Sequence, residues 1–65
     1  MIIVSINNKE AELREGMTIE ELLESLGNTK AAVWINGEQL LKSGYISRIV
    51  GEGDEIKILR ISAGG

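Results

Sequence analysis

The 65-residue sequence contains no cysteine, no histidine and no phenylalanine. The lack of cysteine excludes disulfide bonds, and the lack of both cysteine and histidine excludes metal sites that depend on sulfur or imidazole ligands. With a single tryptophan and a single tyrosine, the core has to be aliphatic, and 43% of the residues are apolar. A chain this short forms one domain and buries only about 60% of the surface that its unfolded form exposes, so its stability depends on packing.

Neither the acidic nor the basic residues are clustered in the sequence. The formal net charge is −3, from seven basic and ten acidic residues that are interspersed along the chain. Nucleic acids and anionic membranes bind concentrated basic surfaces, which argues against both as partners. Residues 1–4 are apolar but too few for a membrane span, and no basic segment precedes them as in a signal peptide. We therefore expect a cytoplasmic protein that is a monomer when free.

Alternating apolar and polar residues predict two strands at the N-terminus. In residues 1–7 every second side chain is a branched apolar one, and residues 10–15 alternate in the same way. Between them, Asn7 and Asn8 predict a turn because asparagine tolerates left-handed backbone angles. The two segments should form a hairpin with one solvated face.

A short amphipathic helix follows the hairpin. Thr18 and Glu21 have the spacing of a capping box, in which each side chain accepts a hydrogen bond from a backbone N–H near the other. Gly27 is a natural C-terminal cap. The apolar residues that recur at helical spacing are Ile19, Leu22, Leu23 and Leu26. This stripe predicts a helix of about two turns.

The second half of the chain predicts three more strands. Residues 31–36 alternate, Asn36-Gly37 is the strongest short turn signal in the sequence, and residues 38–41 form a brief strand. An irregular stretch follows, with a helical turn around residues 45–48 and another turn at 51–54. Residues 55–62 form the last strand.

This order of elements predicts an α+β fold of the β-grasp type. One mixed sheet of four to five strands should carry one main helix across one face. The first and last strands should lie side by side at the centre and run parallel, as their isoleucine-rich sequences indicate. We expect the β-grasp domain to span residues 1–62, with a flexible Gly-Gly tail at 63–65.

Catalytic groups are scarce in this sequence. No nucleophile has a general base beside it, and no serine lies on a glycine-flanked elbow. Glu20, Glu21 and Glu24 could be ligands for a hard cation, but a solvated helix face is the simpler interpretation. Gly51 and Gly53 have the spacing of a phosphate loop, yet the adjoining acids would repel phosphate. We expect that the chain is not an enzyme and that it binds no metal and no cofactor.

The terminal Gly64-Gly65 is the remaining candidate site. A reactive C-terminus has to enter the active site of a partner, and residues 62–65 span roughly 13 Å when extended, at about 3.3 Å per residue. Glycine has no Cβ, so such a tail can pass through a narrow channel. A free carboxylate is a poor electrophile and needs activation, typically as a mixed anhydride with AMP. The chain has no ATP site, so a partner has to supply that step. Taken alone, two terminal glycines could also be a frayed end.

Five segments spread over the whole chain carry a family resemblance. They are residues 2–7, 18–23, Val-Trp-Ile-Asn-Gly-Glu at 33–38, Gly-Asp-Glu-Ile at 53–56 and the terminal Gly-Gly. In their order and spacing they resemble the ThiS-type sulfur carriers of thiamine biosynthesis, relatives of the molybdopterin-synthase small subunit and of ubiquitin. Each piece is short, and the specificity of the resemblance lies in the combination.

The resemblance implies that a ubiquitin-activating-like adenylyltransferase of the ThiF/MoeB type adenylates Gly65 with ATP. The adenylate then becomes a thiocarboxylate, and its sulfur passes to an acceptor enzyme, which in the thiamine branch is a thiazole synthase. Gly65 would be the modified residue, and Ala63 and Gly64 would be the part of the tail that enters the partner's active site. A chain without cysteine fits this role, because the sulfur is carried on the backbone terminus.

One stretch departs from the thiamine-branch pattern, in which a Pro-Arg pair and a downstream tryptophan often follow the Asn-Gly-Glu segment. Here residues 40–45 read Leu-Leu-Lys-Ser-Gly-Tyr. The acceptor therefore stays open among thiamine, molybdenum or tungsten cofactor, and amino-acid sulfur assimilation. Two alternatives of other classes also remain. One is a ubiquitin-like modifier joined through Gly65 to lysines of other proteins, and the other is an interaction module in which the Gly-Gly ending is incidental.

The sheet face opposite the helix is predicted to be the docking surface. The alternation of side chains places four apolar residues on it, namely Ile3, Trp34, Leu59 and Ile61. A contiguous exposed apolar patch usually marks an interface. We expect this patch to bind the activating enzyme and the acceptor enzyme in turn, with Lys57 or Arg60 near its rim.

Overall fold

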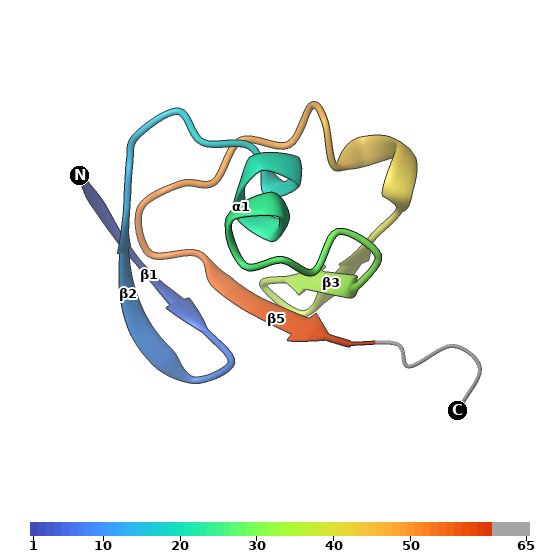
Figure 1. Ribbon diagram of the computed structural model, residues 1–65. Coiled ribbons are helices and arrows are strands. Elements are labelled where there is room, and N and C mark those ends of the chain that lie inside the picture. The colour runs from blue at the N-terminus through green and yellow to red at the C-terminus, as the bar shows by residue number, and fades with distance from the viewer. Residues whose placement is uncertain (61–65) are drawn as a thin grey trace.

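The computed structural model describes residues 1–60 as a five-stranded sheet with one α-helix across it (Figure 1). The strands are β1 (Ile2–Ile6), β2 (Lys9–Leu13), β3 (Ala32–Ile35), β4 (Glu38–Leu40) and β5 (Glu55–Leu59). The helix α1 covers Ile19–Ser25, and the short 3-10 helix η1 covers Lys42–Gly44. The strands and α1 lie where the sequence predicts them, with ends shifted by a few residues.

The strand order in the sheet is β2-β1-β5-β3-β4. β1 and β5 run parallel, with Ser5 opposite Glu55 and Ile6 opposite Ile56, and the other neighbouring strands run antiparallel. β5 is therefore the central strand, although it is the last one in the chain. This arrangement confirms the predicted mixed β-grasp sheet, with the first and last strands side by side.

Both hairpins close through two-residue turns with left-handed backbone angles. Asn7 and Asn8 have φ values of 51° and 67°, and Asn36 and Gly37 have φ values of 53° and 88°. Two consecutive positive φ values define the type I′ turn, whose twist matches that of the flanking strands. Asparagine and glycine are the residues that adopt these angles at low cost, so the sequence fixes the register of both hairpins at their turns.

The helix begins with the predicted capping box. Glu21 N–H donates to Thr18 Oγ1 at 3.2 Å, and Thr18 N–H donates to Glu21 Oε1 at 3.0 Å. The predicted apolar stripe is wrong at its last position, because Leu26 is 50% exposed. The helix has already ended at Ser25, and Gly27, with φ 71°, turns the chain away from the helix axis.

The core lies between α1 and the sheet face that α1 covers. Its residues are aliphatic except for one tyrosine, as the composition predicts. They are Ile2, Val4, Ile19, Leu22, Leu23, Ala31, Val33, Ile35, Tyr45, Val50 and Ile56. Buried and exposed residues alternate along β1, β3 and β5, with Ile6 and Ile58 partly buried against this core. This is the alternation expected of a sheet with one buried face.

The helical turn predicted around residues 45–48 begins earlier, as η1 at Lys42–Gly44. Tyr45 is the buried C-terminal cap of η1, and the turn continues beyond it, where Arg48 N–H donates to the carbonyl of Gly44 at 2.9 Å. The Tyr45 hydroxyl donates to the carbonyl of Ala31 at 2.8 Å. Burial raises the pKa of this hydroxyl, which therefore stays a neutral donor in the core.

Residues 61–65 lie outside the described part of the chain, so the division into a domain at 1–62 and a flexible tail at 63–65 stays a prediction. Within residues 1–60, no helix is both long enough and apolar enough to cross a membrane. The same residues hold no group of three or more carboxylates arranged to bind a metal ion.

Candidate functional site

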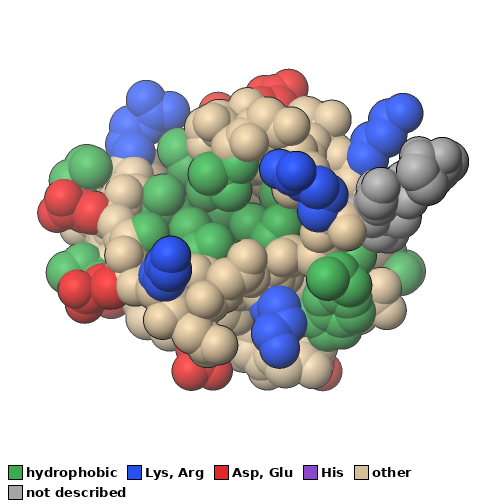
Figure 2. Space-filling view, turned by 60° about the horizontal axis from the view of Figure 1, so that its bottom comes forward, with side chains coloured by type: hydrophobic (Ala, Val, Ile, Leu, Met, Phe, Trp, Pro, Cys, Tyr) green, Lys and Arg blue, Asp and Glu red, His purple; other side chains and the backbone are tan. Residues whose placement is uncertain are grey.

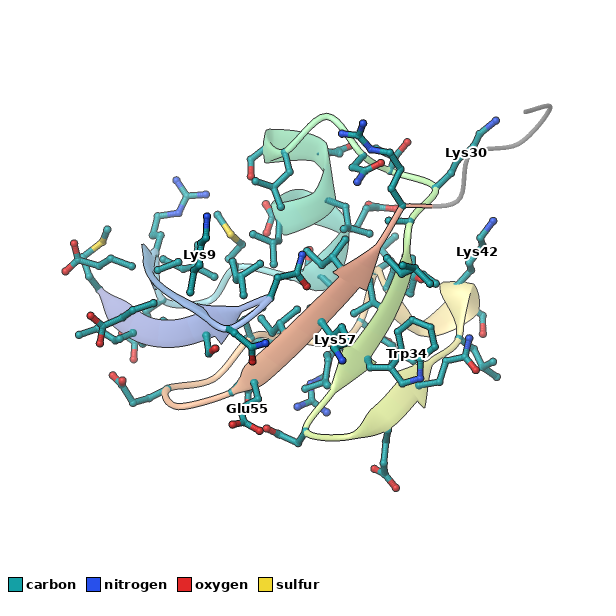
Figure 3. All side chains as sticks on the ribbon, turned by 90° about the horizontal axis from the view of Figure 1, so that it is seen from below. Lys9, Lys30, Trp34, Lys42, Glu55 and Lys57 are labelled. Atoms are coloured by element: carbon teal, nitrogen blue, oxygen red, sulfur yellow. The ribbon has the colours of Figure 1, made fainter. Side chains whose placement is uncertain are left out.

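The central strand β5 presents different side chains to the two faces of the sheet. Ile56 and Ile58 pack toward α1 and the core, whereas Glu55, Lys57 and Leu59 are exposed on the opposite face. We refer to this opposite face as the open face, and Figure 3 shows it from below. Leu59 is 56% exposed there, although it is a large apolar residue close to the end of the central strand.

A hollow of about 620 Å³ lies on the open face and extends from the end of β1 across β5 to β3. Trp34 on β3 is directly opposite Lys57 on β5, and Ala32 is opposite Leu59. Figure 3 shows the side chains of Trp34 and Lys57 next to each other, both projecting from the sheet. The hollow is lined by Ser5, Asn7, Asn8, Trp34, Gly37, Glu55, Ile56, Lys57 and Leu59.

The predicted docking residues are not all in one place. Trp34 and Leu59 line the hollow together, but Ile3 does not. Ile3 is 45% exposed and lies at the other end of the sheet, where its carbonyl accepts a hydrogen bond from Gly53 N–H at 2.9 Å. Ile61 lies outside the described residues. Lys57, expected near the rim, is itself part of the lining.

Charged residues of both signs, Glu55 and Lys57, line the hollow, and more charged side chains surround it on this side of the molecule. Figure 2 shows hydrophobic side chains gathered in the middle, Lys and Arg side chains standing among and around them, and acidic side chains mainly at the margins. The whole chain nevertheless carries more acidic than basic residues.

A hydrogen-bond network fixes the start of β5 around Asp54. Its carboxylate accepts from Gly51 N–H at 2.7 Å and from Asn36 Nδ2 at 3.1 Å, and it lies 3.6 Å from the guanidinium of Arg48. Asn36 Oδ1 accepts in turn from Glu55 N–H at 2.9 Å. One carboxylate thus ties the β3–β4 turn and the loop before β5 to the first residue of the strand.

The pKa of Asp54 reflects this network. Partial burial acts to raise the pKa, but the hydrogen bonds from Gly51 and Asn36 and the charge of Arg48 outweigh it, so the pKa is below its ordinary value. The charged carboxylate is therefore the form that the folded protein stabilises.

The other end of β5 is held on the β1 side by Asn7. Asn7 N–H donates to the carbonyl of Ile56 at 2.9 Å, after which the backbone turns toward β2. The side chain of Asn7 then reaches Ile58, where Oδ1 accepts from the backbone N–H at 2.8 Å and Nδ2 donates to the carbonyl at 3.2 Å. The sequence predicted only a turn at this residue, because nothing in a single sequence indicates which backbone a turn side chain will contact.

The predicted tail residues Ala63, Gly64 and Gly65 lie outside the described part of the chain, and their roles stay predictions. They follow β5 in the sequence after Arg60 and the two residues at 61 and 62. β5 therefore contributes residues to the open face and is the last strand before the predicted tail in the sequence.

Comparison with known proteins decides the family. The family model of the ThiS family matches residues 3–65. The chain belongs to the ThiS family. A comparison with curated proteins gave no match.

Solved structures agree with this ThiS assignment. The crystal structure of the thiamine biosynthesis protein (ThiS) from Geobacter metallireducens superposes with a TM-score of 0.82 at 26% identity, over 98% of this chain and 100% of that one. The NMR solution structure of a thiamine biosynthesis protein from the same organism gives a TM-score of 0.79 at 26% identity, over 98% and 88% of the two chains. Membership in the family supports a role as a sulfur carrier rather than as a catalyst.

The stretch that departs from the thiamine-branch pattern, residues 40–45, lies away from the hollow. It forms the end of β4, η1 and the buried Tyr45. None of its residues is in the lining of the hollow. The departure therefore alters the part of the fold that packs against α1, and leaves the lining of the open face as it is.

Proposed function

We propose that this protein carries sulfur for thiamine biosynthesis as a thiocarboxylate on its C-terminal glycine, Gly65. The observation that carries the proposal is the match of the ThiS family model, which extends to residue 65 and so includes the Gly-Gly ending. The similarity to a solved thiamine biosynthesis protein over nearly the whole chain supports the same pathway.

The proposed chemistry takes place at the carboxylate of Gly65 in two steps. First, a carboxylate oxygen attacks the α-phosphorus of ATP, which forms an acyl adenylate and releases pyrophosphate. Second, a sulfide attacks the acyl carbon, AMP leaves with the electron pair of the broken C–O bond, and a thiocarboxylate remains. The sulfur then passes to an acceptor enzyme, in this pathway a thiazole synthase.

The partner has to supply ATP and the adenylation site, and we propose a ThiF/MoeB-type adenylyltransferase for this role. The carrier's own contribution is to bind that enzyme and present its terminus. Trp34 and Leu59 supply apolar contact area on the open face, and Lys57 between them supplies one positive charge for a carboxylate of the partner. Because these residues lie on or beside the strand that leads to Gly65, docking and presentation are coupled.

The first experiment measures the intact mass of the protein after incubation with a ThiF/MoeB-type enzyme, ATP and sulfide. We expect a gain equal to the replacement of one oxygen by sulfur, and no gain when Gly65 is deleted. An unchanged mass, with an enzyme that modifies another carrier under the same conditions, would reject the sulfur-carrier function. A ladder of heavier conjugates in cells would instead favour the protein-modifier alternative.

A second experiment tests docking through the hollow. Lys57→Glu reverses the charge beside Trp34, whereas Lys42→Glu makes the same change in η1, beside α1. We expect Lys57→Glu to raise the KM of adenylation by roughly tenfold with little change in kcat, since like charges placed at an interface weaken binding. The effect should shrink as salt is added. Equal KM values for the two variants would show that docking does not use the hollow.

A further inference from the structure

The parallel ladder between β1 and β5 stops one step short of the end of β5. Ser5 N–H donates to the carbonyl of Asp54 and Asn7 N–H to that of Ile56, both at 2.9 Å. In a regular parallel ladder the next two bonds would join the N–H and carbonyl of Ile58 to the continuing β1 backbone. β1 has ended at that point, because Asn7 adopts φ 51° and starts the turn to β2.

The side chain of Asn7 takes the place of the missing strand. Oδ1 accepts from Ile58 N–H at 2.8 Å, and Nδ2 donates to the Ile58 carbonyl at 3.2 Å. A side-chain amide carries the same donor and acceptor as a peptide group. The Asn7 amide therefore pairs with Ile58 as one more peptide unit of β1 would.

The other edge of β5 cannot provide these two bonds. Successive residues of a strand direct their N–H and carbonyl groups to opposite sides. Those of Ile58 point toward β1, so the pairing of β5 with β3 at this position brings Val33 and Ile58 together without a bond to the Ile58 backbone. Within residues 1–60, Asn7 is the last contact on the β1 side before β5 ends.

The turn itself does not require this amide. Asn8, the next residue, adopts the same left-handed region with φ 67°, and neither of the side-chain bonds to Ile58 involves it. Glycine would satisfy both turn positions at least as well. Besides forming the turn, the asparagine at position 7 thus supplies two side-chain hydrogen bonds to the strand that leads to the C-terminus.

We propose that Asn7 is a positioning residue for the reaction at Gly65. By pairing with Ile58, its side chain keeps the last part of β5 in line with the sheet, and so sets the direction in which the C-terminus enters the partner's active site. This inference depends on the proposed function. Positioning matters because a misplacement of about 1 Å at a reacting group can lower a rate by roughly 100-fold.

The test compares Asn7→Gly with Asn36→Gly, the same change at the first position of the other type I′ turn. Both variants keep left-handed turn positions, and only the first removes the amide that contacts Ile58. The rate of adenylation is measured from the pyrophosphate released. The temperature is one at which the fluorescence of Trp34 shows that both proteins are folded. We expect kcat to fall by roughly tenfold in Asn7→Gly and to be unchanged in Asn36→Gly, whose asparagine does not line the hollow. The amide hydrogen of Ile58 should exchange faster only in Asn7→Gly.

A further variant guards against a folding defect. Asn7→Asp keeps an acceptor for Ile58 N–H but loses the donor to the Ile58 carbonyl, so we expect a smaller fall in kcat than in Asn7→Gly. The inference is overturned if the amide hydrogen of Ile58 exchanges faster in Asn7→Gly but kcat is the same in the wild type, Asn7→Gly and Asn7→Asp. The bonds between Asn7 and Ile58 would then be only structural. If even the wild type forms no adenylate at Gly65, the proposed function itself fails, which is a distinguishable result.

Discussion

The two ends of the central strand are held in different ways. At each end, the asparagine of a type I′ turn bonds to the β5 backbone, Asn36 to Glu55 and Asn7 to Ile58. At the start, the partly buried carboxylate of Asp54 adds three further contacts, and its side chain is only 13% exposed. At the end, the hydrogen bonds that Ile58 makes with residues 1–60 on the β1 side come from the exposed side-chain amide of Asn7, and Leu59 is exposed on the open face.

The difference indicates how one strand serves two purposes. Stability in proteins is not uniform, and regions with few buried contacts and exposed hydrogen bonds open most easily. The start of β5 is linked through Asp54 and Asn36 to two other segments and anchors the fold. The end has few such links, and it borders both the hollow and the C-terminal residues.

The first prediction concerns side chains on the same strand that face opposite ways. Ile56 is 3% exposed and packs in the core, whereas Leu59 is 56% exposed. Ile56→Ala should lower the free energy of unfolding by about 2–5 kcal/mol, because it removes buried methyl groups and leaves a cavity. Leu59→Ala should change it by less than about 0.5 kcal/mol, as for most surface substitutions.

Urea unfolding followed by circular dichroism measures both values. A 65-residue domain has little stability in reserve, so Ile56→Ala is expected to be partly unfolded even without denaturant. If the two variants lost the same stability, the contrast between the core and the open face of β5 would be wrong.

The second prediction removes the anchor at the start of β5. Asp54→Ala leaves the donors of Gly51 and Asn36 without their acceptor and removes the ion pair with Arg48. We expect a loss of about 1–3 kcal/mol, the usual cost of leaving partly buried polar groups unpaired. Glu38→Ala, an exposed position on β4, is the matched control and should have little effect. Equal losses in the two variants would contradict an anchoring role for Asp54.

The third prediction follows from the lowered pKa of Asp54. Since the folded protein holds this pKa below the unfolded value, the network contributes its full stability above the unfolded pKa of an aspartate. That contribution should be lost as the pH falls from there through the lower folded pKa. The Tm of the wild type should therefore decrease with acidification more steeply than that of Asp54→Ala, as measured by thermal unfolding at a series of pH values. Parallel curves for the two proteins would contradict the assignment.

The sequence predicted the elements because their signals are local. The Asn-Asn and Asn-Gly turns, the Thr18 capping box and the alternation along β5 each depend on a few neighbouring residues, and each is confirmed. The β-grasp topology also followed from the order of these elements. Leu26 was misplaced because helical spacing alone does not indicate at which residue a two-turn helix ends.

Contacts between distant segments were beyond the reach of the sequence. Asn7 bonds to Ile58 across 51 positions, and Asn36 to Glu55 across 19. Both asparagines were assigned to turns, which is correct but accounts only for their backbone angles. The open face was predicted from the alternation of side chains along the strands. Alternation does not indicate how far along a strand a residue lies. Ile3 was therefore grouped with Trp34, although Ile3 is not in the lining of the hollow.

The smallest expected effect comes from the second asparagine. Asn36→Gly keeps the left-handed angle and the backbone bond to Glu55 but loses the side-chain bonds to Glu55 and Asp54. We expect a loss of about 1 kcal/mol in urea unfolding. Adenylation should keep its wild-type kcat, because Asp54 still holds the start of β5 through Gly51.

The two asparagines then separate stability from positioning. Their contacts on β5 are three residues apart, roughly 10 Å at about 3.3 Å per residue, so the stability losses in a double variant with Asn7→Gly should add. The kcat of that double variant should equal the kcat of Asn7→Gly alone. A further fall in kcat on adding Asn36→Gly would mean that the start of β5 also directs the C-terminus, and the division between an anchoring end and a presenting end would not hold.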